Sequence, residues 1–192
     1  GGVQFKEYLQ DDFEARLIEF NTLMGDMSFE SDLAVEQKLV KKTSEAINLV
    51  EEPFTDMIDM GLEIPDDIII MHKGKVEAAF VAMASSWNPR NVQGKSLSEV
   101  HQPVADNEAL IRASEGIWRS MVSGKSFHRH VWGISPLKGL SNHPRHKKPP
   151  IKSLNDLYFR IEHERTLTVD KDTAAFFIDV EVHPLSAIFH LK

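Results

Sequence analysis

The chain has 192 residues, of which 42% are hydrophobic and 27% charged, and its formal net charge is −7. This length and composition are typical of one soluble globular domain and argue against wholesale disorder. The chain has no cysteine, which excludes disulfides, iron–sulfur clusters, thiolate zinc sites and a thiol nucleophile. The acidic balance argues against nucleic acid as a partner.

The apolar runs are short. The run around residues 68–71 is far below the length of a membrane-spanning helix, and no charged-then-apolar signal segment opens the sequence. We therefore expect a cytoplasmic protein without a membrane segment.

Residues 1–60 have a helical pattern. A second helix is expected from Ser31, whose hydroxyl could cap it, and Pro53 ends it. The segment forms either a helical layer on the domain that follows or a dimerisation arm, which would make the chain a homo-oligomer. A first helix, broken at Gly25-Asp26, is indicated by apolar residues at helical spacing: Phe13, Leu17, Ile18 and Phe20.

Strand patterns begin after Pro65. Residues 67–72 and 76–84 predict a hairpin with Gly74 at its turn, and the second run is apolar on both faces, which implies burial on both sides. A loop is expected over residues 85–104. A helix follows, capped by Asn107 and ended by Gly124.

The last third of the chain alternates between strands and loops. Residues 128–135 predict a short strand, and residues 136–150 predict an irregular basic loop that we expect to be exposed and mobile. Two further strands are expected over residues 157–169 and 173–182, joined by a turn at Asp170-Lys171-Asp172.

The order of these elements is helices, two strands, a helical crossing and three strands. It predicts an α+β fold with a PAS-like five-stranded antiparallel sheet, whose helices cover one face and leave a pocket between helix and sheet. Residues 1–60 would form an N-terminal helical segment packed on a PAS-like domain of residues 61–192.

His101 is the first candidate for chemistry. It lies where the loop of residues 85–104 enters the crossing helix, so its imidazole would point into the predicted pocket, and Pro103 would stiffen the loop. An imidazole in such a place can ligate haem iron. The alternative is a histidine that caps a helix or bonds to a backbone carbonyl group.

A second candidate is a set of cationic side chains near the expected pocket mouth. Guanidinium groups can pair with both oxygens of a carboxylate and an ammonium group can pair with one, so this set suits haem propionates or another carboxylate. The alternative is that Arg160 and Arg165 pair with Glu162, Glu164 or Glu181 on a solvated sheet surface. The set comprises Lys95 in the loop and Arg129, Arg160 and Arg165 on adjacent strands.

The histidines at 128, 130, 143 and 146 have spacings that zinc ligands can use, but no acidic residues flank them to orient the rings. The last two are read more simply as part of a solvated basic loop. The sequence also has no P-loop, no G-x-G-x-x-G after a strand and no G-x-S-x-G.

An ordered series of short motifs covers about residues 60–190. Its members are Ser85-Ser86-Trp87, Gly94, VHQPV at residues 100–104, Arg129-x-x-Trp132, Arg160-x-Glu162, Glu164-Arg165-Thr166-Leu167 and Ala175-Phe176-Phe177-Ile178. This series resembles the haem-dependent oxidative N-demethylase family, formerly catalogued as a domain of unknown function.

The resemblance implies a PAS-like fold that binds haem b, with His101 as axial ligand. Around the cofactor it places Lys95, Arg129, Trp132, Arg160 and Arg165. It also implies an enzyme that removes a methyl group from a small secondary amine such as dimethylamine. Electrons would come from NADPH through a separate reductase subunit containing flavin and an iron–sulfur cluster, which fits a chain without cysteine.

The chain departs from the family pattern at Gln93, Ala105, Val131 and the Arg165-Thr166 junction. Two alternatives to the enzyme therefore stay open. One is a non-catalytic PAS-like sensor or binding module for haem or another small ligand. The other is a structural interaction domain that holds no cofactor.

Overall fold

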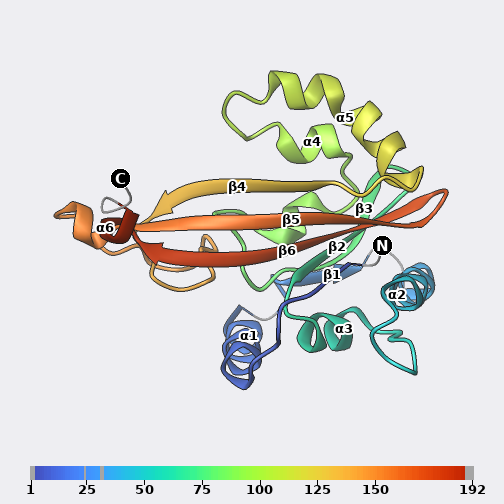
Figure 1. Cartoon of the computed structure of the whole chain (residues 1–192), viewed down its shortest axis with the longest axis horizontal. Coiled ribbons are helices and arrows are strands. Elements are labelled where there is room, and N and C mark those ends of the chain that lie inside the picture. Colours follow the sequence, from blue (N-terminus) through green and yellow to red (C-terminus); the bar gives the residue numbers. More distant parts are fainter. Residues whose placement is uncertain (1–2, 24, 31–32, 189–192) are drawn as a thin grey trace.

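The computed structural model describes residues 3–23, 25–30 and 33–188. Its centre is a six-stranded sheet in the order β1-β3-β2-β6-β5-β4, in which every neighbouring pair is antiparallel (Figure 1). The strands are β1 (Ser28–Glu30), β2 (Asp67–His72), β3 (Lys75–Phe80), β4 (His128–Ser135), β5 (Tyr158–Asp170) and β6 (Thr173–Pro184).

The prediction of five strands is wrong by one. The five predicted strands are present, and β1 adds a sixth beside β3, with Phe29 opposite Ala79. β1 has only three residues. A run that short shows neither alternation nor turn signals of its own, so it becomes a strand only through pairing with β3.

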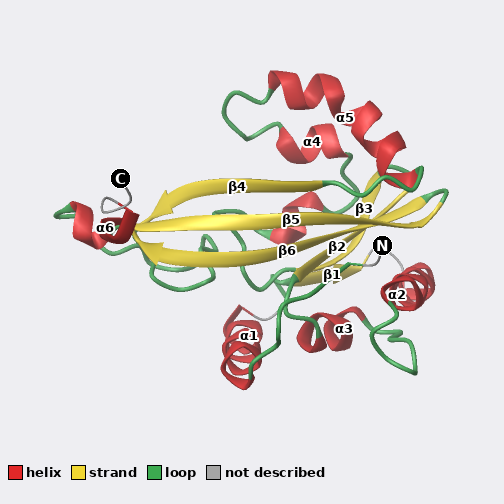
Figure 2. Ribbon diagram, in the orientation of Figure 1, coloured by secondary structure: helices red, strands yellow, loops and turns green. Residues whose placement is uncertain are grey.

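Helices cover both faces of the sheet, which corrects the expectation of helices on one face. α1, α2 and α3 lie on one side, and α4 and α5 lie on the other (Figure 2). Their bounds are α1 (Gln10–Leu23), α2 (Leu33–Ile47), α3 (Met57–Glu63), α4 (Leu97–His101), α5 (Glu108–Val122) and α6 (Leu185–Ile188); short 3-10 turns lie at Pro89–Val92 and Leu154–Asp156.

The sheet has a hydrophobic core on each face, and successive side chains of β2 point alternately into one core and the other. Ile68 and Ile70 join the larger core, to which α1, α2 and α3 contribute, whereas Met71 joins the smaller core beneath α4 and α5. The predicted burial of residues 76–84 on both sides is confirmed, since Ala78 and Phe80 lie in the larger core and Val76 and Ala79 in the smaller one. The turn of the β2–β3 hairpin is confirmed as well, since Lys73 and Gly74 both have positive φ angles, 50° and 79°, as a type I′ turn requires.

A buried ion pair holds α1 against the sheet. The guanidinium group of Arg16 lies 3.2 Å from the carboxylate of Asp67, and both side chains are almost fully buried. The same carboxylate accepts hydrogen bonds from the backbone N–H groups of Ala82 and Met83, at 2.8 and 2.9 Å. A charged side chain of α1 is thus buried with the core.

The basic segment of residues 136–150 is not uniformly exposed. Asn142 and His143 are buried. The backbone N–H of Asn142 donates to the carbonyl of Ala84 at 2.8 Å, and its carbonyl accepts from Ser86 N–H at 3.0 Å. The segment thus docks on the end of the hairpin, which corrects the predicted exposure. The predicted cap at Ser31 lies outside the described residues.

Candidate functional site

A cavity of about 130 Å³ lies between the α4–α5 pair and the sheet. It is where the topology predicted a pocket, between the helical crossing and the strands. The wall is mostly apolar. Its lining includes Leu97 and His101 from α4, Leu110, Ile117 and Met121 from α5, Phe127 and His128 beside or in β4, and Arg129, Glu164, Thr166 and Phe176 from the sheet.

His101 is the last residue of α4, a helix of five residues. The helix begins with a capping box: the Ser96 hydroxyl accepts from Glu99 N–H at 3.4 Å, and the Glu99 carboxylate accepts from Ser96 N–H at 2.8 Å. This S-x-x-E pattern is a sequence signal for the start of α4, so the prediction of a loop over all of residues 85–104 is wrong. α4 thus fixes the backbone of His101 beside the cavity.

The ring of His101 is oriented by its own helix. Nδ1 lies 2.7 Å from the carbonyl oxygen of Leu97, and since a carbonyl only accepts, Nδ1 carries the proton. The alternative in which His101 bonds to a backbone carbonyl is therefore realised. It leaves Nε2 with a lone pair, and within the described residues no hydrogen bond to Nε2 is found. A nitrogen in this state is ready to ligate a metal.

Asn107 closes the turn behind His101. Its side-chain N–H groups donate to the carbonyl oxygens of His101 and Gln102, at 3.0 and 2.7 Å. Asn107 does precede α5, but its side chain makes no capping bond to that helix. The predicted capping by this side chain is thus wrong, because the carbonyl groups at the end of α4 compete for it.

Arg129 and Glu164 form a pair across β4 and β5 at the cavity wall. They are opposite each other in the register, and Nη2 of Arg129 lies 3.1 Å from Oε1 of Glu164 while Nε donates to Oε2. Glu164 is only 8% exposed. The expectation that Glu164 lies on a solvated surface is therefore wrong, because Arg129 and the lining of the cavity cover it.

The other predicted cofactor residues do not line this cavity. The guanidinium group of buried Arg160 donates to Ser85 Oγ at 2.5 Å and to two backbone carbonyls. Arg165 pairs with Asp66 and donates to the carbonyl of Gln4. Two residues lie at the surface: Lys95, which is exposed, and Trp132, which is 67% exposed. Of the predicted set, the structure brings together His101 and Arg129.

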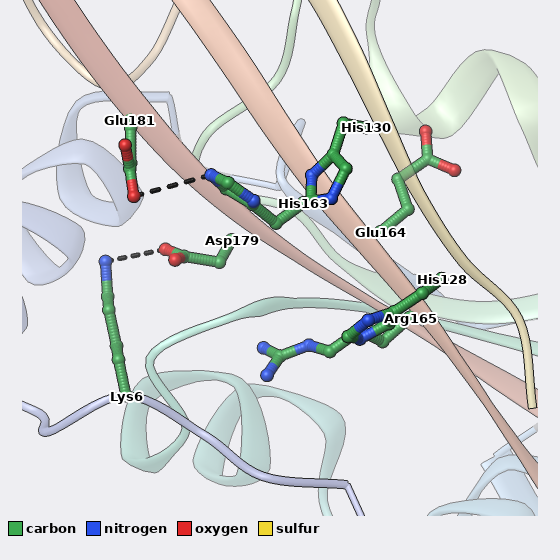
Figure 3. Close-up of a pocket in the computed structure, with 8 residues that line it drawn as sticks. All are labelled: Lys6, His128, His130, His163, Glu164, Arg165, Asp179 and Glu181. Carbon is green, nitrogen blue, oxygen red and sulfur yellow. Dashed lines mark ion pairs between the residues drawn. The ribbon is translucent and has the colours of Figure 1, made fainter.

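A second cavity of about 210 Å³ lies on the opposite face of the β4–β6 part of the sheet (Figure 3). The rings of His130 and His163 meet there edge to face, with 4.8 Å between centroids. Two pairs form within its lining: Lys6 lies 2.6 Å from Asp179, and His163 Nε2 lies 3.4 Å from Glu181. The other two charged side chains of the lining bind residues outside it, Glu164 binding Arg129 and Arg165 binding Asp66.

The four histidines considered for zinc form two separate pairs, and within the second pair the ring centroids of His143 and His146 are 6.5 Å apart. His128 and His130 line the second cavity, whereas His146 lies 2.6 Å from Glu19 of α1 and His143 is buried in the docked segment. Over the residues the structure describes, no three His, Cys, Asp or Glu side chains are grouped so as to hold a metal ion. None of the described helices combines the length and apolar character needed to cross a membrane.

The structure thus places a small, mostly apolar cavity beside the imidazole of His101. Residues 26–185 match the family model described as haem-dependent oxidative N-demethylase, alpha subunit-like. The chain therefore belongs to this family, which confirms the resemblance drawn from its motifs. A comparison with curated proteins finds no match.

Proposed function

We propose that this chain binds haem b and is the catalytic, alpha-type subunit of an oxidative N-demethylase that acts on a small secondary amine. The observation that carries the proposal is the state of His101. Metal-ligating histidines commonly donate their second ring N–H to a carbonyl or carboxylate group, and His101 makes this bond to Leu97 beside an apolar cavity.

The donor set at the cavity fits haem. His101 would hold the iron through Nε2, and residues such as Ile117 and Phe176 would form an apolar wall. Arg129 would hold a propionate only in competition with Glu164, which it already binds. When bound, haem supplies the oxygen chemistry. The protein's own residues orient the group, exclude water and hold its charges.

The cavity is small, so the helices α4 and α5 that cover it must move to admit haem. A cavity of about 130 Å³ is smaller than the ~300–1,000 Å³ of typical small-molecule pockets, so a macrocycle requires α4 and α5 to separate from the sheet. α5 has 15 residues, of which Ser114 and Met121 are buried. Separating α5 from the sheet would also expose Ile117 and Trp118, which pack against the smaller core, so bound haem would have to replace this apolar contact.

The sheet supports a PAS-like assignment for residues 61–192. Without β1, the strand order is β3-β2-β6-β5-β4, with α4 and α5 between β3 and β4 in the chain. This is two strands, a helical crossing and three strands, as the sequence predicts for such a fold. In the same proposal, residues 1–60 pack on this domain through the larger core.

The subunit role rests on the family description, which names an alpha subunit, and on the absence of cysteine. A chain without thiolates cannot hold an iron–sulfur relay of the usual kind. We therefore assign electron supply to a separate reductase that carries flavin and an iron–sulfur cluster.

The first test is an absorbance titration of the purified chain with haemin. We expect a Soret band that is lost or shifted in His101→Ala and retained in His183→Ala, a matched control at an exposed histidine on β6. A spectrum of wild type with haemin that equals the sum of the separate spectra of protein and free haemin would contradict haem binding. Formaldehyde release from dimethylamine with a competent reductase then tests the reaction, and haem binding without turnover would favour a sensor instead.

A further inference from the structure

The strand β4 forms one free edge of the sheet. It is the last strand in the sheet order, and its eight residues pair with β5 in an unbroken register from His128 opposite Arg165 to Ser135 opposite Tyr158. The other edge strand, β1, has three residues. Short edges resist pairing with other chains, whereas a long regular edge offers a full row of backbone groups.

One hydrogen bond at the start of β4 shows which residues of this strand point their backbone N–H and C=O groups toward β5. The N–H of Thr166 in β5 donates to the carbonyl of Phe127 at 3.1 Å. Since alternate residues of an antiparallel strand face the same neighbour, the residues in step with Phe127 bond to β5. The residues that face away are His128, His130, Trp132 and Ile134, and over the described residues no strand pairs with them.

Apolar side chains are exposed along this edge, beside the exposed polar side chains of residues 128–130. Trp132 is 67% exposed, Ile134 54% and Val131 38%. Proteins usually protect long edges with lysine, proline, a bulge or an inward charge. β4 has no proline and no bulge, and its one formal charge, Arg129, is bound to Glu164 of β5. None of the usual devices therefore protects this edge.

We propose that β4 is a self-pairing interface, through which two copies of this chain join antiparallel about Val131 into one continuous sheet. In this register Val131 faces Val131 of the second copy, His130 faces Trp132, and Arg129 faces Gly133. The charged half of each strand thus lies opposite the uncharged half of the other. A parallel arrangement would instead place Arg129 against Arg129, which is unfavourable.

The register about Val131 also uses all the free backbone groups. His128 lies opposite Ile134 and His130 opposite Trp132, so every outward-facing residue meets another outward-facing residue. Val131 then sits in a non-hydrogen-bonded pair, where the two Cα atoms are about 4.5 Å apart. This distance lies within the range of about 4.4–6.8 Å that a disulfide spans.

The absence of cysteine makes a cross-linking test direct, since each single substitution introduces the only thiol in the chain. Under mild oxidation at low protein concentration, we expect Val131→Cys to form a covalent dimer at least about tenfold faster than Ile151→Cys, because pairing raises the effective thiol concentration. Ile151 is 57% exposed and lies outside the strands, which makes it a matched control.

Sedimentation gives an independent readout that needs no haem. The wild-type chain should be a dimer, Val131→Lys should be a monomer with unchanged circular dichroism, and Ile151→Lys should remain a dimer. A wild-type monomer at all concentrations, or equal cross-linking of the two cysteine variants, would overturn the proposal. Preferential cross-linking of Trp132→Cys would overturn the register about Val131.

Discussion

The Nδ1 atom of His101 lies 2.7 Å from the carbonyl oxygen of Leu97, one helical turn earlier in α4. This bond sets the tautomer and the direction of the ring in the absence of any ligand. It exists only when α4 is formed, and α4 is a five-residue helix that depends on its capping box. The orientation of the His101 ring therefore depends on the capping box at Ser96.

Ser96→Ala should weaken haem binding by about fivefold, because a lost cap costs about 1 kcal/mol of helix stability. The measurement is a Soret titration, with thermal unfolding in parallel. Ser153→Ala removes a comparable capping box from the 3-10 turn at Leu154–Asp156 and should leave haem affinity unchanged. Equal affinities of wild type and Ser96→Ala would show that α4 does not control the ligand.

Two helical glycines should respond in opposite ways to alanine. A Cβ on Gly61 of α3 would lie 2.1 Å from the ring of Phe80, whereas a Cβ on Gly116 of α5 meets nothing within 4 Å. We expect Gly61→Ala to destabilise the protein by about 1–3 kcal/mol through overpacking. Gly116→Ala should stabilise it by roughly 0.5–1 kcal/mol through helix propensity. Urea unfolding measures both, and a stabilised Gly61→Ala would contradict the packing of α3 on β3.

The buried Arg16–Asp67 pair should be costly to break from one side. Arg16→Met leaves the Asp67 carboxylate buried with only backbone donors, and we expect a loss of about 3–5 kcal/mol in the free energy of unfolding. The double variant Arg16→Met/Asp67→Asn should recover part of the loss. Arg112→Met, in an exposed pair with Glu108, should change stability little. Similar urea curves for the two single variants would argue against the pair.

Asp66 should make stability depend on pH. Burial raises the pKa of its carboxyl from 3.8 to about 6, against the opposing effect of Arg165. Between these values the folded state binds more protons than the unfolded state, so the contribution of Asp66 is present below about pH 4 and is lost as the pH rises through about 6. The unfolding free energy of wild type minus that of Asp66→Asn should fall by up to roughly 3 kcal/mol over this window.

The control for this titration is Asp170→Asn. Burial raises the pKa of Asp170, but hydrogen bonds from Lys42, Asp172 and Thr173 outweigh it and lower the pKa to about 2. Its contribution is therefore lost only as the pH falls below about 4, and the difference from wild type should be flat between about pH 5 and 7. Parallel pH profiles for wild type and Asp66→Asn would contradict a raised pKa at Asp66.

Local patterns in the sequence were sufficient for much of the fold. The hairpin turn at Gly74, the end of α5 before Gly124 and the five longer strands follow from periodicity and turn residues, which act over a few positions. The motif series was likewise sufficient for the family. His101 could be placed beside a pocket because the order of elements determines which helix crosses the sheet.

Only the tertiary structure decided where charge and polarity are buried. The sequence suggests that Glu164 and His143 lie at the surface, yet both are buried, and Arg16 of α1 is buried against Asp67, 51 residues further along the chain. The same holds for β1, a strand only because β3 lies beside it, and for Arg165, which faces Asp66 rather than the cavity of His101. Periodicity reports which face of an element is apolar, but burial of a charge depends on a specific partner, and that partner is set by the fold as a whole.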